Sequence, residues 1–176
     1  MRLFVAIPLS QDMRDSLIFC QNELYDLGIR GNYSPVENLH ITLAFIGEHP
    51  DPDAVLDALS GVSFTPIPIS LNGIGAFGDL WWAGISGSPA LEAVSRRIRH
   101  ALAESSIPFD RKKFSPHITI LRKASADRIP AVALKQASMM VDRIVLYRSD
   151  RGKNGMIYTE LGQIQAKAAV WAEDRR

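Results

Sequence analysis

A four-residue motif occurs twice in this 176-residue chain, and its repetition constrains the fold more than any other feature. His-Ile-Thr-Leu occupies residues 40–43 and His-Ile-Thr-Ile occupies residues 117–120, so the copies are offset by 77 positions (117 minus 40). With four histidines and four threonines in the chain, chance would supply only about 0.1 His-x-Thr pairs. A motif repeated so far above chance predicts a repeated structural unit around it.

The spacing of apolar residues predicts the same order of elements around both motifs. After an opening strand at residues 2–7, the first copy comprises helix 10–28, strand 39–46, helix 53–60 and paired strands 67–77 and 80–86. The second copy comprises helix 90–104, strand 117–121, helix 127–136 and paired strands 139–149 and 156–164. The tail after Gln165 is expected either to form a short helix around Val170 and Trp171 or to fray.

Two such copies predict two similar lobes with a cleft between them, because equivalent strands of the repeat would face each other. Strands mix with helices and connect mostly as hairpins, which is typical of the α+β class rather than of a doubly wound sheet. A length of 176 residues suits one domain at roughly 150 residues per domain. We therefore expect residues 1–176 to form one bilobal α+β domain, with two pseudo-symmetric helix-strand-hairpin lobes, antiparallel sheets and a central cleft.

The composition narrows the class of function. A hydrophobic fraction of 47% and a charged fraction of 22% are typical of a folded globular domain. Lysine and arginine number 20 against 19 acidic residues, a net charge of +1. This balance argues against coating long nucleic acids by bulk charge, but it allows a phosphate ligand or a nucleic-acid end. The single cysteine, Cys20, excludes an intramolecular disulfide and a cysteine-based metal cluster.

The hydropathy pattern predicts a cytoplasmic protein. No apolar run approaches the roughly 20 residues that a membrane helix needs. The apolar opening stretch stops at Pro8 without a small-residue cleavage site, which favours a core strand over a signal peptide. No apolar stripe is left over beyond the core patterns, so a monomer is expected.

Each motif is predicted to present two polar side chains on one face of a strand. Successive residues of a strand point to opposite faces, so His40 and Thr42 share a face, whereas Phe45 is expected in the core. His117 and Thr119 repeat this arrangement. At the interface of two lobes, the two strands would direct two imidazoles and two hydroxyls into one cleft.

That set of groups suits in-line displacement at a phosphate. One neutral imidazole can accept a proton from the attacking water or hydroxyl, and one protonated imidazole can donate a proton to the leaving oxygen. Threonine hydroxyls can hydrogen-bond the non-bridging phosphate oxygens and stabilise the charge of the transition state. The residues therefore predict acid–base phosphoester chemistry without a metal.

A zinc site is the main competing interpretation of the histidine pair. Catalytic zinc usually has three protein ligands and structural zinc has four. Near the two strands only Glu37 and Glu48 are candidate additional ligands, and neither is repeated in the second copy. We therefore expect no metal and no other cofactor.

The two His-x-Thr-x motifs resemble those of the 2H phosphoesterase superfamily, and within it the bacterial RNA 2′,3′-cyclic phosphodiesterases, also called LigT-like 2′-5′ RNA ligases. The resemblance covers most of the chain. It includes the opening strand at residues 2–8, the first signature at 37–48, a middle hairpin at 75–78, the second signature at 114–122 and a late strand at 146–149. It implies a bilobal α+β fold with the cleft between two antiparallel sheets.

The resemblance implies hydrolysis of a terminal 2′,3′-cyclic phosphate to a 2′-phosphomonoester without a metal, and weak reverse joining of 2′-5′ RNA ends. By position, His40 would be the general acid that protonates the leaving 3′ oxygen, and His117 the general base that activates water. Thr42 and Thr119 would hold the phosphate, and Arg122 would assist there. The implied partners are RNA ends or nucleoside 2′,3′-cyclic phosphates.

The sequence leaves open which strand face carries Arg122 and which aromatic side chains contact the substrate. Regular alternation would place Arg122, five residues after His117, on the opposite face, so it needs either a bulge or a position at the strand end. Phe114, Tyr147 and Arg148 are candidates for contact with a base or with RNA. Residues 31–34 depart from the Trp and Pro of many relatives, and Tyr33 would take the place of the aromatic residue.

Two alternatives remain open from the sequence. The same chemistry could act on 2′-5′ oligonucleotides or on a small cyclic phosphate, which residues outside the motifs would decide. The chain could instead be a non-catalytic module that binds a nucleotide. Both motif histidines are intact, and a module that only binds would not need them, so the sequence favours an enzyme.

Overall fold

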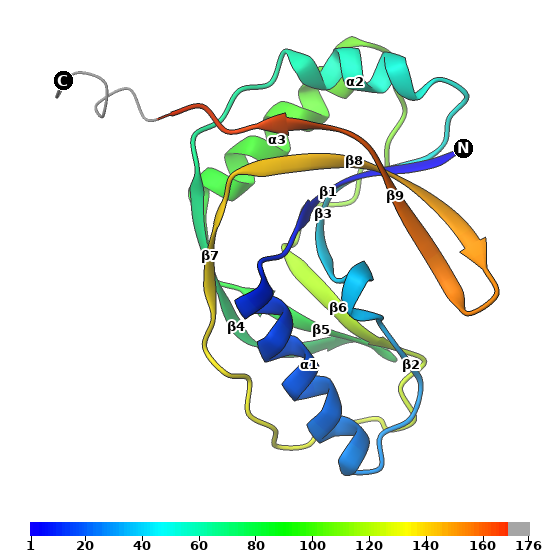
Figure 1. Cartoon of the computed structure of the whole chain (residues 1–176), viewed down its shortest axis with the longest axis vertical. Coiled ribbons are helices and arrows are strands. Elements are labelled where there is room, and N and C mark those ends of the chain that lie inside the picture. Colours follow the sequence, from blue (N-terminus) through cyan, green and yellow to red (C-terminus); the bar gives the residue numbers. More distant parts are fainter. Residues whose placement is uncertain (169–176) are drawn as a thin grey trace, which may run out of the picture.

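Two antiparallel sheets form the frame of the computed structural model, which describes residues 1–168 (Figure 1). The first sheet has the order β3-β1-β8-β9. Its strands are β1 (Arg2–Pro8), β3 (His40–Glu48), β8 (Arg143–Gly152) and β9 (Gly155–Gln165). The second sheet has the order β2-β6-β5-β4-β7. Its strands are β2 (Asn32–Tyr33), β4 (Ile67–Phe77), β5 (Leu80–Ile85), β6 (His117–Arg122) and β7 (Ser138–Val141).

Within the described residues, three α-helices cover the sheets: α1 (Gln11–Asp26), α2 (Pro52–Ser60) and α3 (Pro89–Glu104). Side-chain caps start them, because Ser10, Asp51 and Ser88 each accept a hydrogen bond from a backbone N–H of the first turn. Along the described chain, no helix combines the length and the apolar character needed to cross a membrane. The α+β class expected from the pattern of elements is confirmed.

Each sheet is covered by a helix that follows a strand of the other sheet. Helix α1 follows β1 of the first sheet and contacts β6 and β7 of the second. Helix α3 follows β5 of the second sheet and contacts β3 of the first, with α2 beside it against β9 (Figure 1). The apolar faces of the helices are thus buried on both sheets.

The repeated unit of the chain is a strand, a helix and an adjacent antiparallel strand. It occurs as β1-α1-β3 and as β5-α3-β6. The hairpin β8-β9 from the second half of the chain completes the first sheet, and β4 from the first half completes the second. Each sheet therefore contains strands from both halves, and the two motif strands, β3 and β6, contact each other across the two sheets.

The helix predicted at residues 127–136 is wrong, because this segment has no regular structure. Pro130 interrupts it, and a proline inside a helix removes a donor and clashes with the preceding turn. The segment runs along α1 instead, where the Ala133 N–H donates to Glu23 and the Lys135 carbonyl accepts from Ser16. These tertiary hydrogen bonds replace those of a helix.

The single strand predicted at residues 139–149 is also corrected. The chain forms β7 and β8 here, with Asp142 between them. Strand β7 pairs with β4 of the second sheet, whereas β8 pairs with β1 and β9 of the first. An apolar run does not reveal that the chain passes from one sheet to the other. The helix considered around Val170 and Trp171 lies outside the described residues.

Candidate active site

The two motifs lie on facing strands, one from each sheet. His40 is the first residue of β3 and His117 is the first residue of β6. His40 and Arg122 line the same cleft between the sheets, and His117 begins the strand that contacts β3. The structure thus brings His40 and Arg122 together and places His117 on the adjoining motif strand.

Two hydrogen bonds fix the ring of His40. Its Nδ1 lies 2.6 Å from the carbonyl oxygen of Asn38, and its Nε2 lies 2.9 Å from the Thr42 hydroxyl. A carbonyl oxygen can only accept, so Nδ1 carries the proton and Nε2 of the neutral ring accepts from Thr42. The nitrogen that faces Thr42 is therefore the one available for proton transfer.

The first of these two hydrogen bonds recurs at His117. Its Nδ1 lies 2.6 Å from the carbonyl oxygen of Ser115, two residues earlier, as Asn38 is two residues before His40. The backbone before each motif thus selects the same tautomer in both copies and leaves Nε2 of each ring for exchange of a proton.

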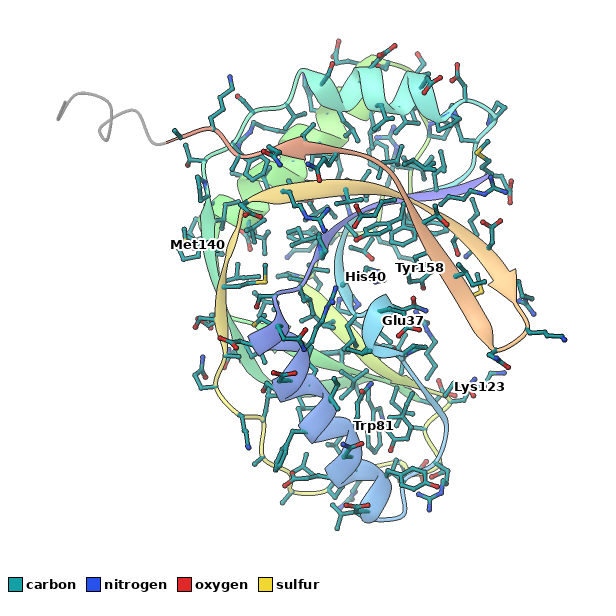
Figure 2. All side chains as sticks on the ribbon, in the orientation of Figure 1. Glu37, His40, Trp81, Lys123, Met140 and Tyr158 are labelled. Carbon is teal, nitrogen blue, oxygen red and sulfur yellow. The ribbon has the colours of Figure 1, made fainter. Side chains whose placement is uncertain are left out.

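Aromatic rings pack beside both imidazoles. The His40 ring lies 5.0 Å from Phe4 and 5.4 Å, edge-on, from Tyr158 (Figure 2). The His117 ring lies 5.4 Å, edge-on, from Phe77. Trp82 lies 6.3 Å from His117 on the same side. Both imidazoles therefore have aromatic neighbours that restrict the orientation of the ring.

Burial lowers the pKa of His40 below its ordinary value. The positive charges of Arg122 and His117 lower this pKa further, whereas the hydrogen bond to the Asn38 carbonyl opposes the change. In the free protein the environment therefore favours neutral His40. An anion bound beside the ring would reverse the electrostatic part of this effect.

The effect of Arg122 on His40 is directly measurable. Replacing Arg122 with glutamine removes a nearby positive charge, so the imidazolium becomes less unfavourable and the pKa of His40 should rise towards its ordinary value. An NMR titration of the His40 ring protons would measure this. Lys123→Gln is the matched control, because the Lys123 charge is not among those that act on His40. An unchanged or lower pKa in Arg122→Gln would contradict the assignment.

A β-bulge in each motif strand changes which side chains reach the site. On β3, Thr42 pairs with Ala6 and Ala44 pairs with Val5, so Leu43 has no partner on β1. The extra residue reverses the alternation beyond it. As a result Phe45, which was expected in the core, is half-buried and lines the cleft with His40 and Thr42.

The bulge recurs at the equivalent position of β6. Thr119 pairs with Trp82 and Leu121 pairs with Trp81, so Ile120 has no partner on β5. The bulge directs Arg122 to the same face of β6 as Thr119. A bulge was one of the two explanations that the sequence offered for the position of Arg122. It occupies the position in its motif that Phe45 occupies in the other.

The cleft has two compartments that meet at His40 and Arg122, and His117 is not among the lining residues of either. The larger measures about 450 Å³ and the smaller about 290 Å³, and both are lined by His40 and Arg122. Thr119 lines the larger compartment and Thr42 the smaller. Tyr33 also lines the larger one.

Three side chains considered for RNA contact lie elsewhere. Phe114 packs against the main core. Tyr147 is only 9% exposed and stacks on Phe4 at 5.2 Å, beneath the cleft rather than in it. Arg148 lies on the opposite face of β8 from Tyr147 and forms an ion pair with Asp150 at 2.9 Å.

Two further aromatic residues of the cleft were not singled out from the sequence. Tyr158 on β9 lines both compartments, and Phe4 on β1 lines the smaller one. Alternation along each strand would place these rings on one face, but which strands are neighbours is not visible in the sequence. Arg2, which also lines the smaller compartment, was missed for the same reason.

The two glutamates considered as metal ligands are not placed with the histidines to share an ion. Glu48 forms an ion pair with the N-terminal ammonium at 3.2 Å, and Glu37 is exposed on the short 3₁₀ helix η1 (Val36–Asn38). Within residues 1–168, no three His, Cys, Asp or Glu side chains are grouped for a shared ion.

The sequence is similar to a known protein family and to several of its members. The family model of the 2′-5′ RNA ligase superfamily matches residues 26–153. The RNA 2′,3′-cyclic phosphodiesterase of Thermus thermophilus is 34% identical over 179 residues, covering 92% of this chain and 88% of that protein. The protein of the same name from Geobacillus stearothermophilus is 28% identical over 85% of this chain, which spans about half (52%) of its length.

Solved structures of similar proteins superpose on this chain. The crystal structure of E. coli LigT complexed with 3′-AMP superposes with a TM-score of 0.81 at 27% identity, covering 95% of this chain and 98% of that chain. The crystal structure of TT0787 of Thermus thermophilus superposes with a TM-score of 0.80 at 28% identity, covering 94% and 97%.

Proposed function

Because the chain belongs to the 2′-5′ RNA ligase superfamily, we propose that it is an RNA 2′,3′-cyclic phosphodiesterase that converts a terminal 2′,3′-cyclic phosphate to a 2′-phosphomonoester. The observation that carries the proposal is the matched orientation of His40 and His117. Each ring donates from Nδ1 to the carbonyl two residues earlier, which leaves Nε2 for proton transfer, and His40 shares the cleft with Arg122.

In the proposed reaction, His117 accepts a proton from water as the water oxygen bonds to phosphorus. The bond from phosphorus to the 3′ oxygen breaks, and protonated His40 donates its proton to that oxygen. The bound cyclic phosphate is an anion, so it favours the imidazolium that His40 needs for this step.

Thr42, Thr119 and Arg122 are proposed to bind the non-bridging oxygens. A guanidinium stabilises the charge that develops on these oxygens, and the hydroxyls orient the phosphate for in-line attack. The same arrangement would accept the 5′-hydroxyl of a second RNA end in place of water. Attack by that hydroxyl would form a 2′-5′ phosphodiester. This joining of RNA ends would be the weaker of the two activities.

The test is an RNA oligonucleotide with a terminal 2′,3′-cyclic phosphate, incubated with the protein in the presence of EDTA. We expect the mass to increase by one water and the product to co-migrate with the 2′-phosphate standard, because the bond to the 3′ oxygen is the one that breaks. An oligonucleotide with a linear 3′-phosphate is the control and should remain unchanged. Loss of turnover in EDTA, or a 3′-phosphate product, would refute the proposal.

A further inference from the structure

Three guanidinium groups line the smaller compartment of the cleft, those of Arg2, Arg122 and Arg151. No carboxylate is among its lining residues. Within the described residues 1–168, none of the three arginines has a carboxylate within 4.0 Å, and all three are exposed. A compartment with three uncompensated cations and no anion favours an anionic ligand.

Regular strands, rather than loops, hold the two arginines outside the motif. Arg2 pairs with Ser149 across β1 and β8, and Arg151 follows two residues later on the same face of β8. Ser149 itself lines the compartment. The Arg2 guanidinium also lies 4.9 Å from the ring centroid of Phe45, a cation–π contact that holds it against the cleft wall.

The larger compartment has a different character. Among its lining residues Arg122 is the only arginine or lysine, and the amides of Asn32, Asn38 and Asn154 surround the rest of the space. Amides and a tyrosine suit the uncharged edges of a nucleoside. A second anion of the substrate would therefore bind in the smaller compartment.

We propose that Arg2 and Arg151 bind a second phosphate of the substrate, the one on the 5′ side of the ribose that carries the cyclic phosphate. This inference rests on the proposed function, in which Arg122 holds the reacting phosphate. The compartment also contains His40 and Thr42, so it begins at the reacting centre and continues towards Arg2 and Arg151. Consecutive phosphates of a nucleic acid are separated by one ribose, and the planar guanidinium forks match phosphate oxygens.

The inference defines the substrate class. The protein should act on ends that carry a 5′ phosphate group, either a phosphodiester of an RNA chain or a terminal monoester. A nucleoside 2′,3′-cyclic phosphate with a free 5′-hydroxyl should be a poorer substrate, because it leaves Arg2 and Arg151 unused.

The test compares kcat/KM for three substrates: adenosine 2′,3′-cyclic phosphate, the same compound with a 5′-phosphate, and the dinucleotide ApA with a terminal 2′,3′-cyclic phosphate. We expect at least ~10-fold preference for substrates with two phosphates. The double variant Arg2→Gln/Arg151→Gln should reduce this preference at least ~10-fold, with the main change in KM. Preference for the dinucleotide identifies an RNA chain as the source, and preference for the 5′-phosphate compound alone identifies a mononucleotide.

Arg148→Gln is the matched control, because it removes the same charge from the opposite face of β8. It should change the preference less than ~2-fold. The inference would be overturned if the double variant lost kcat/KM equally for all three substrates. It would also be overturned if the unmodified protein showed no preference for the substrates with two phosphates.

A binding measurement separates this inference from the proposed function. Calorimetry with adenosine 2′-phosphate and adenosine 2′,5′-bisphosphate requires no turnover. The double variant should lose affinity for the bisphosphate at least ~10-fold more than for the monophosphate. If no substrate is hydrolysed but this difference appears, the second-phosphate site stands and the hydrolytic function fails. If the two affinities fall equally, the site is refuted whatever the activity.

Discussion

Replacing His40 or His117 with alanine is expected to lower kcat/KM for an RNA 2′,3′-cyclic phosphate by at least ~100-fold in each case. Each substitution removes the only imidazole that can serve one end of the proton transfer, and the remaining imidazole cannot be both donor and acceptor in one step. The two residues would act as a unit, so the double variant should lose little more than the worse single variant. Single-turnover hydrolysis rates of the three variants would measure this.

His100→Ala is the control for these variants. His100 is on α3, its side chain is 74% exposed, and its Nε2 lies 3.6 Å from the carboxylate of Glu104, one helical turn away. This variant should retain full activity. Activity that survives loss of His40 or His117 would refute the two-histidine mechanism. The chain would be a nucleotide-binding module if it showed no turnover and if its His40→Ala variant bound adenosine 2′-phosphate as tightly as the unmodified chain.

Replacing Trp81 with alanine is expected to lower the free energy of unfolding by about 3–5 kcal/mol. Trp81 is 1% exposed and is among the largest fully buried side chains of the core. Its removal takes away the burial of a large apolar surface and leaves a cavity that the surrounding strands can fill only in part. Urea denaturation followed by circular dichroism would measure the change.

Trp81→Phe should recover a substantial part of that loss, because an aromatic ring still fills much of the space. Trp81 pairs with Leu121, the residue next to Arg122 at the bulge of β6. We therefore expect activity of the alanine variant to fall as well, even at temperatures where it remains folded. A loss of unfolding free energy below ~1 kcal/mol would contradict the structure of this core.

Much of the local structure could be predicted from the sequence. The helices expected at residues 10–28 and 90–104 form as Gln11–Asp26 and Pro89–Glu104, within a few residues of their predicted ends. The strands of both motifs also form where expected. These elements depend on apolar periodicity and on side-chain caps, which involve residues a few positions apart.

The segment at residues 127–136 shows where local reasoning fails. Its composition allows a helix, but the segment has no regular structure and forms hydrogen bonds to Glu23 and Ser16 of α1 instead. Those partners are more than 100 positions away in the chain. Weak helical preference is easily overridden by contacts of this kind.

The sequence by itself determined that His40 shares a strand face with Thr42, and His117 with Thr119, because the alternation of side chains is a property of one strand's backbone. It could not determine the orientation of residues beyond the bulges, since a bulge exists only relative to a paired strand. Pairing of β3 with β1 and of β6 with β5 directs Phe45 and Arg122 into the cleft. Only the assembly of the sheets adds the aromatic rings and the arginines from β1, β8 and β9, because the order of strands depends on long-range packing rather than on local sequence.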